Sequence, residues 1–112
     1  MTPYNRVILT GRVANSPQRY YRPDGSPVVQ FPLELNDSKD VAGQPSHSLI
    51  NIVACGDLAE FRFDLLQNGQ HLLVVGRLNQ RHWQTPEGKH RTLTEVIATD
   101  LRQMEETNRT RE

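Results

Sequence analysis

The amino-acid sequence predicts an all-β domain that contains one helix and carries an extended basic β-hairpin. Several segments alternate apolar and polar residues with the period of two that half-buried strands show. Gly11 and Gly76 fall inside two of these segments, where they indicate the bulges or sharp bends that a small barrel needs. One segment, residues 57–68, instead repeats its apolar residues at helical spacing.

The first half of the chain contains four predicted strands, at residues 5–13, 18–21, 27–35 and 49–55. Pro23, Asp24 and Gly25 have the composition of a turn between the second and third of these strands. Pro32 cannot donate a backbone hydrogen bond and therefore marks an edge or a bulge. Residues 49–55 are nearly all apolar, which predicts a strand that is buried on both faces or at an interface.

The second half begins with the predicted helix. Asp57 is placed to cap it, with Glu60 three residues on, and Asn68-Gly69 ends it. A strand from His71 then leads through a turn at residues 85–88 to a return strand that is expected to end near Thr99.

Three major strands, one helix and two further strands is the order of an OB-fold, a five-stranded Greek-key barrel. An SH3-like barrel lacks such a helix, and a ferredoxin-like fold needs two. We expect residues 1–101 to form this domain and residues 102–112 to be a polar, frayed tail.

Length and composition agree with a single domain. The chain has 112 residues, and no apolar run approaches the ~18 residues of a membrane span. We see no secretory signal at the start, and the single cysteine, Cys55, fits a reducing compartment. The expectation is therefore a cytoplasmic protein without a membrane partner, associated with the nucleoid if it binds DNA.

The formal net charge is zero, but the charges are unevenly distributed. Residues 1–30 hold four arginines against one acid, and residues 76–91 hold four bases against Glu87. Between them, residues 31–75 hold six acids against two bases. If the two basic segments meet in the fold, a neutral protein presents a basic face; the alternative is ordinary solvated charge.

The hairpin at residues 75–99 combines cations with the only tryptophan of the chain, Trp83. Trp83 shares strand parity with Arg77, Asn79 and Arg81, so we expect an exposed ring rather than a core ring. Cations that track phosphates beside a ring that stacks bases are what single-stranded nucleic acid requires. Tyr20 and Tyr21 are adjacent, so at least one points outward as a second stacking candidate.

Catalytic and metal sites are not predicted. The four histidines form no ligand pattern, no glycine-rich loop leads into a helix, and Cys55 has no obvious base beside it. Asp37 and Asp40 share a polar loop with Lys39 and are expected to be solvated. We therefore expect a protein that is not an enzyme and that uses no cofactor.

Several motifs together resemble the bacterial single-stranded DNA-binding proteins and their relative, primosomal replication protein N. Residues 5–11 look like the opening strand of that family, residues 19–25 its turn, and residues 56–60 its helix start. The hairpin motifs are Gly76-Arg77-Leu78, Arg81-His82-Trp83, Gly88 and Thr94-Glu95-Val96. The resemblance covers about residues 5–99.

The resemblance implies sequence-independent binding of single-stranded DNA in replication or replication restart. The candidate DNA-binding residues are Trp83, Arg81, Arg77, His82, Lys89, Arg91, Tyr21, Arg6, Arg12 and Lys39. Two alternatives stay open. One is an OB module that acts mainly as a protein–protein adaptor, and the other is RNA binding, because nothing in the sequence senses a 2′-hydroxyl.

The chain also departs from the pattern it resembles. Lys39 and Leu49 stand at tryptophan positions and Cys55 at a phenylalanine position, a loss of aromatics that resembles primosomal replication protein N. Family members assemble through the first strand and the sheet surface. Val75 replaces an acidic residue near the second of these contacts, so we expect a homodimer rather than a tetramer, with replication-restart proteins as further candidate partners.

Overall fold

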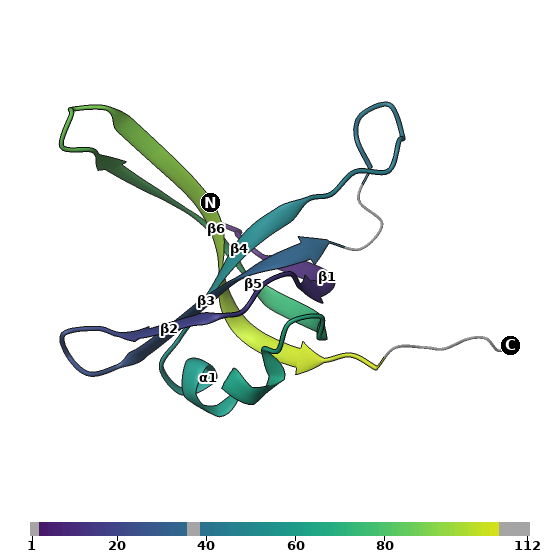
Figure 1. The fold of residues 1–112 in the computed structure, drawn as a ribbon, viewed down its shortest axis with the longest axis horizontal. Helices are drawn as coiled ribbons and strands as arrows, with labels where there is room; N and C mark the ends of the chain where they lie inside the picture. Colours follow the sequence, from purple (N-terminus) through teal and green to yellow (C-terminus); the bar gives the residue numbers. More distant parts are fainter. Residues whose placement is uncertain (1–2, 36–38, 106–112) are drawn as a thin grey trace, which may run out of the picture.

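The computed structural model describes residues 3–35 and 39–105 of the chain. The elements within them follow in the order β1 (Val7–Val13), β2 (Gln18–Tyr21), β3 (Pro27–Leu35), β4 (Leu49–Cys55), α1 (Gly56–Phe61), the 3-10 turn η1 (Phe63–Leu65), β5 (His71–Gln84) and β6 (His90–Gln103) (Figure 1). The predicted bounds of β2, β3 and β4 are confirmed. β1 starts two residues later than expected, and the Asn5 side chain instead binds both backbone groups of Leu78, at 2.8 and 2.9 Å.

Five of the strands close into a barrel, which confirms the predicted OB-fold. The strands of the sheet follow the order β1-β5-β6-β4-β3-β2, and an additional pairing of β1 with β3 closes the ring. All pairs are antiparallel except β4 with β6, which run parallel. β2 lies outside the ring and forms a projecting hairpin with β3 (Figure 1).

Gly11 and Pro32 lie where strands change partners. β1 pairs with β5 along most of its length and with β3 from Gly11 onward, and a Cβ at Gly11 would overlap the backbone of Glu34. Along β3, the pairing with β2 extends as far as Gln30, and the pairing with β1 begins at Leu33. Pro32 sits at this change, where its missing N–H costs no ladder bond.

The barrel core is aliphatic and centres on Phe31. The fully buried side chains around it come from every strand of the ring, and they include Leu33, Ile52, Leu72, Val74, Val96 and Leu101. Ala59 of α1 and Leu66, just after η1, close one end of this core. Burying these side chains is the main favourable term for folding, at about 25 cal/mol per Å² of apolar surface.

The prediction for the helix was wrong in its length and its cap, and in one of its three apolar residues, since Leu58 and Leu65 pack against the core but Phe61 does not. α1 begins at Gly56, so Asp57 lies in the first turn and makes no capping hydrogen bond. α1 already ends at Phe61, whose ring is 71% exposed, and η1 follows. The tighter turn changes the helical phase so that Phe63 and Leu66, rather than Phe61, pack against the core.

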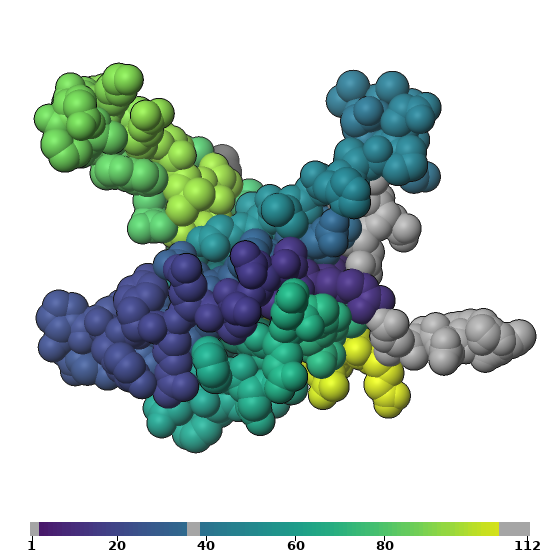
Figure 2. Space-filling model, in the orientation of Figure 1, coloured from purple at the N-terminus to yellow at the C-terminus, as the bar shows by residue number. Residues whose placement is uncertain are grey.

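The β5–β6 hairpin is the longest element of the structure, with 14 residues in each strand. It projects from the barrel on the same side as the separate loop at residues 39–48 (Figures 1 and 2). β6 continues to Gln103, past the expected Thr99, because Arg102 and Gln103 still pair with β5. The rest of the predicted tail, from residue 106 on, lies outside the described residues, as does Asp37.

A β-bulge interrupts the hairpin within the barrel, because β6 still pairs with β4 at Glu95–Ile97 beyond it. Val75 pairs with Asp100 and Gly76 with Ala98, so Thr99 is the extra residue. A Cβ on Gly76 would overlap the carbonyl oxygen of Ile97. The close approach of the two backbones at this point therefore requires glycine.

Replacing Gly76 by alanine is expected to lower the free energy of unfolding by about 2–3 kcal/mol, because the new methyl group must displace β6. Urea unfolding measures this loss. Gly43→Ala is the control: Gly43 has a φ of +82° but open space around its Cβ, so it should lose only about 1 kcal/mol, from backbone strain alone. Equal losses in the two variants would show that the close approach at Gly76 is unimportant.

Candidate nucleic-acid interface

The outer face of the sheet carries a groove between the β2–β3 hairpin and the base of the β5–β6 hairpin. Its floor is apolar and comes from three strands: Val28 of β3, Val53 and Cys55 of β4, and Ile97 of β6. Val28 pairs with Cys55, and Val53 pairs with Ile97, so these residues follow one another across the sheet. The face of β4 opposite the core therefore forms the groove floor. The expectation that this strand is buried on both faces or at an interface holds only in part, because Val53 is buried but Leu49 is 61% exposed.

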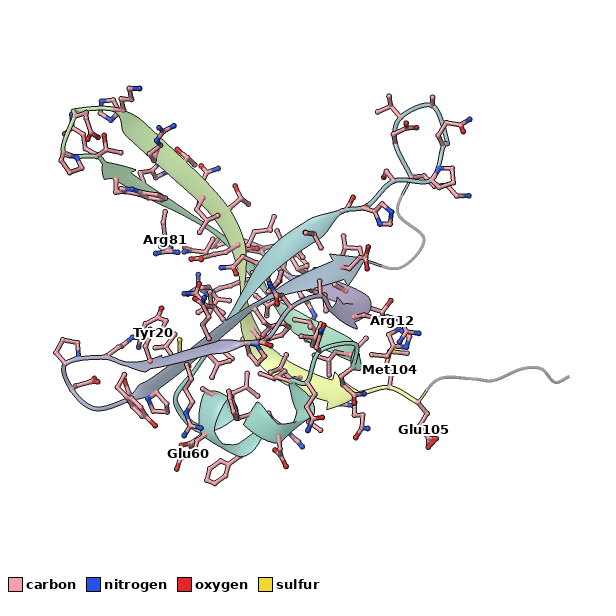
Figure 3. The ribbon with its side chains drawn as sticks, in the orientation of Figure 1. Arg12, Tyr20, Glu60, Arg81, Met104 and Glu105 are labelled. Carbon is pink, nitrogen blue, oxygen red and sulfur yellow. The ribbon has the colours of Figure 1, made fainter. Side chains whose placement is uncertain are left out.

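Polar side chains surround this floor. Arg77 and Arg81 enter from β5, and Tyr20 and Arg22 enter from the β2–β3 hairpin. Figure 3 shows Tyr20 and Arg81 facing the space between the two hairpins. Arg22 donates a hydrogen bond of 3.2 Å from Nη2 to the Sγ atom of Cys55. Residues far apart in the sequence thus place three guanidinium groups around one groove.

Trp83 extends this surface along the hairpin. Its indole is 47% exposed, which confirms the expectation that it is not a core residue. Arg81 lines both the groove and a second hollow formed with His82 and Trp83. Because residues 77, 79, 81 and 83 alternate on one strand, the ring lies on the same face as the groove arginines.

A buried carboxylate lies beneath this surface. Glu95 of β6 is only 2% exposed. Its Oε2 atom forms an ion pair with Nε of Arg81 at 3.0 Å and accepts a hydrogen bond from Nδ2 of Asn79 at 3.1 Å. A buried carboxylate needs such partners, because an uncompensated charge in a protein interior is costly.

The two tyrosines of β2 point to opposite faces, although both are exposed. Tyr20 pairs with Val28 and lines the groove. Tyr21, the candidate from the sequence, is its neighbour and faces the other side, where the Arg19 guanidinium lies 5.8 Å from the Tyr21 ring centre and 4.8 Å from that of Phe63. The structure therefore does not bring Tyr21 to the groove and brings Tyr20 instead.

The other candidate residues are divided between the hairpin and distant positions. Arg91 pairs with Trp83, and His82 lines the hollow beside Trp83, with its Nδ1 atom 3.3 Å from the Thr92 hydroxyl. Lys89 belongs to the turn at the tip of the hairpin, where its backbone bonds Thr85.

Two candidates lie away from the groove, and a third lies beside it. Arg12 binds the carbonyl oxygen of Gly69 at 3.1 Å, and Figure 3 places it beside Met104, on the far side of the barrel. Lys39 lies in the separate loop, where it bridges to Pro45. Arg6 directly precedes β1, between the Val7–Gly76 pair and the contact of Asn5 with Leu78, and is therefore next to Arg77 of the groove. The structure does not bring Arg12 or Lys39 together with Trp83.

Sequence reasoning named Tyr20 and Tyr21 as alternatives but placed only Tyr21 among the DNA-binding candidates, and it did not select Arg22 or Glu95. Arg22 and Tyr20 are two residues apart, so strand parity places them on one face, and this was the available signal. Glu95 becomes visible only when its pairing opposite Asn79 is known.

The described residues contain no group of three His, Cys, Asp or Glu side chains that could hold a metal ion. Nor does this part of the chain contain a helix long and apolar enough to cross a membrane.

A closed OB barrel with guanidinium groups and aromatic rings around an outer groove has the features of a single-strand nucleic-acid-binding protein. A sequence profile of the Single-strand binding protein family matches residues 4–104. The single-stranded DNA-binding protein of Thermotoga maritima is 34% identical over 110 residues, which are 94% of this chain and 77% of that protein. The chain belongs to the single-strand binding protein family.

Solved structures agree with this assignment. The Plasmodium falciparum SSB in complex with ssDNA superposes with a TM-score of 0.81 at 23% identity, over 94% of this chain and 98% of that one, which shows a shared fold. A deletion mutant of the single-stranded DNA binding protein from Thermus aquaticus has a TM-score of 0.75 at 29% identity. That match covers 95% of this chain and 53% of that one.

Proposed function

We propose that this protein binds single-stranded DNA without sequence preference and is not an enzyme. The observation that carries the proposal is the continuous surface from Tyr20 and Arg22, across Arg77 and Arg81, to Trp83. Family membership and the ssDNA-bound structural relative support DNA as the ligand.

The chemistry of the surface explains why binding is independent of sequence. Guanidinium groups contact phosphates, which every nucleotide carries, and an indole ring stacks on the face of any base. The apolar floor of Val28, Val53 and Ile97 accepts base or sugar surface without reading hydrogen-bond patterns. Single-stranded RNA also offers phosphates and base faces, so the binding test compares RNA with DNA as the ligand.

We further propose that the protein acts as a homodimer through β1. In the described part of the chain, β1 pairs with β3 only over Gly11–Val13, which leaves the edge at Val7–Leu9 beside β5 alone. Ile8 of this segment is 58% exposed, next to Val75 on the neighbouring strand. An exposed strand edge with an apolar side chain favours pairing with a second copy.

The cellular role follows from the proposed ligand. Single-stranded DNA arises in replication and replication restart, so we place the protein in the cytoplasm, at nucleoid DNA, with restart proteins as candidate partners. An adaptor role is the second candidate, favoured by the exposed ring of Phe61 beside the acidic residues Asp57, Glu60 and Asp64.

Binding to oligo-dT is expected to be tighter than binding to duplex DNA and to weaken steeply with salt. Three or four phosphate contacts, at about 0.7 per contact, give a slope of roughly −2 to −3 in log affinity against log salt. Fluorescence anisotropy with oligo-dT, oligo-rU and a duplex at several salt concentrations measures this. A slope near zero, or equal affinity for duplex, would refute the proposal. Tighter binding of oligo-rU would assign RNA as the ligand.

Trp83→Ala is expected to weaken oligo-dT binding about five-fold or more, because stacking on an aromatic ring contributes roughly 1–3 kcal/mol per base. The melting temperature should stay nearly unchanged, since the ring is half exposed. Tyr21→Ala is the matched control, an exposed ring outside the groove whose loss should leave affinity within about two-fold. Equal losses of affinity in the two variants would contradict the proposed path of the strand.

Ile8→Glu is expected to convert the dimer into a monomer, because it places a charge in the proposed β1 contact. Sedimentation velocity at micromolar concentration distinguishes the two states. Phe61→Glu, an equivalent change at an exposed ring on α1, should leave the dimer intact. A wild-type protein that sediments as a monomer or as a stable tetramer would contradict the proposed assembly.

A further inference from the structure

The pairing of Arg81 with Glu95 is incomplete. Oε2 of Glu95 accepts the contacts from Arg81 and Asn79, whereas its Oε1 atom is buried with no hydrogen-bond partner in the described part of the chain. An arginine that clamps a carboxylate binds both oxygens in parallel. Arg81 instead contributes only Nε to this ion pair.

Arg81 itself remains accessible. Its side chain is 51% exposed, whereas that of Glu95 is 2% exposed. The ion-pair contact is made at Nε, and the half-exposed side chain lines the groove, where a phosphate can reach it. A phosphate that binds there approaches a guanidinium whose charge is already compensated by a fixed, buried carboxylate.

We propose that Glu95 is a built-in competitor of the DNA phosphate for Arg81, and that it keeps the affinity of the groove low. This inference rests on the proposed function, because it requires Arg81 to contact DNA. The negative charge of Glu95 stays in place when DNA binds, and it opposes the incoming phosphate through a poorly screened interior. Bound single-stranded DNA is therefore released from the groove more readily.

The opposite role would be positioning, in which Glu95 holds Arg81 in the geometry that binds DNA. The contacts favour competition over positioning. The contact with Arg81 is an ion pair at Nε without the parallel hydrogen bonds of a clamp, and the second carboxylate oxygen makes no bond that would hold the guanidinium. Removing the carboxylate charge should therefore relieve the repulsion of the phosphate by more than it loosens the position of the guanidinium.

The test is binding of oligo-dT to Glu95→Gln, which keeps the shape of the side chain and removes its charge. We expect affinity at low salt to rise about ten-fold and the salt slope to steepen by up to ~0.7, the value of one phosphate contact. Glu87→Gln is the matched control, since it removes the same charge from the tip of the same hairpin and should change affinity by less than about three-fold. Weaker binding by Glu95→Gln would overturn the proposal in favour of positioning.

A double-mutant cycle isolates the pair from general charge effects. Arg81→Gln should cost more affinity in the Glu95→Gln protein than in the wild type, and equal costs would overturn the proposal. If Glu95→Gln does not fold, single arginine variants that keep Glu95 still test the proposal. Arg81→Gln should reduce the salt slope less than Arg77→Gln, since no ion pair of the described residues includes Arg77. An equal or larger reduction would overturn the proposal, whereas a wild type that does not bind oligo-dT would refute the proposed function itself.

Discussion

The antiparallel pairing of β5 with β6 is the interaction on which the rest of the structure depends. The pairing extends from Leu72 and Gln103 in the barrel to Gln84 and His90 at the tip of the hairpin, and one bulge beside Gly76 interrupts it. Below the bulge, Leu72, Val74 and Leu101 are core residues. Val96 and Ala98, beyond the bulge, are core residues too, and only past Glu95 do the same two strands leave the barrel and carry Arg81 and Trp83. One ladder therefore supports both the core and the candidate interface.

Strand parity separates these two tasks along the same strands. Val96 points into the core, while its neighbours Glu95 and Ile97 line the groove. In β4, Ile52 and Ala54 are core residues, whereas Val53 and Cys55 form the groove floor. The groove is thus held by side chains whose immediate neighbours are fixed in a close-packed core, so its shape changes little without unfolding the barrel.

The sequence predicted those features that depend on local periodicity. The alternation of apolar and polar residues located the strands, and the order of elements sufficed for the OB-fold. The helix was mispredicted because a tertiary demand, the burial of Phe63 and Leu66, overrides the local spacing that favours Phe61. The choice between Tyr20 and Tyr21 depends on the β2–β3 register, and the role of Glu95 depends on the pairing of β6 with β5. Neither can be derived from one strand alone.

The neutral net charge acquires a physical meaning once the acids are located. Asp57, Glu60 and Asp64 lie on α1 and η1, at the end of the barrel away from the projecting hairpin (Figure 1). At physiological salt, charges separated by more than about 8 Å on the surface are largely screened from one another. The acids of the helix are exposed to the screening solvent, whereas Glu95, buried beside the groove, acts directly on Arg81. The position and burial of the charged side chains, rather than the net charge, determine how this protein interacts with a polyanion.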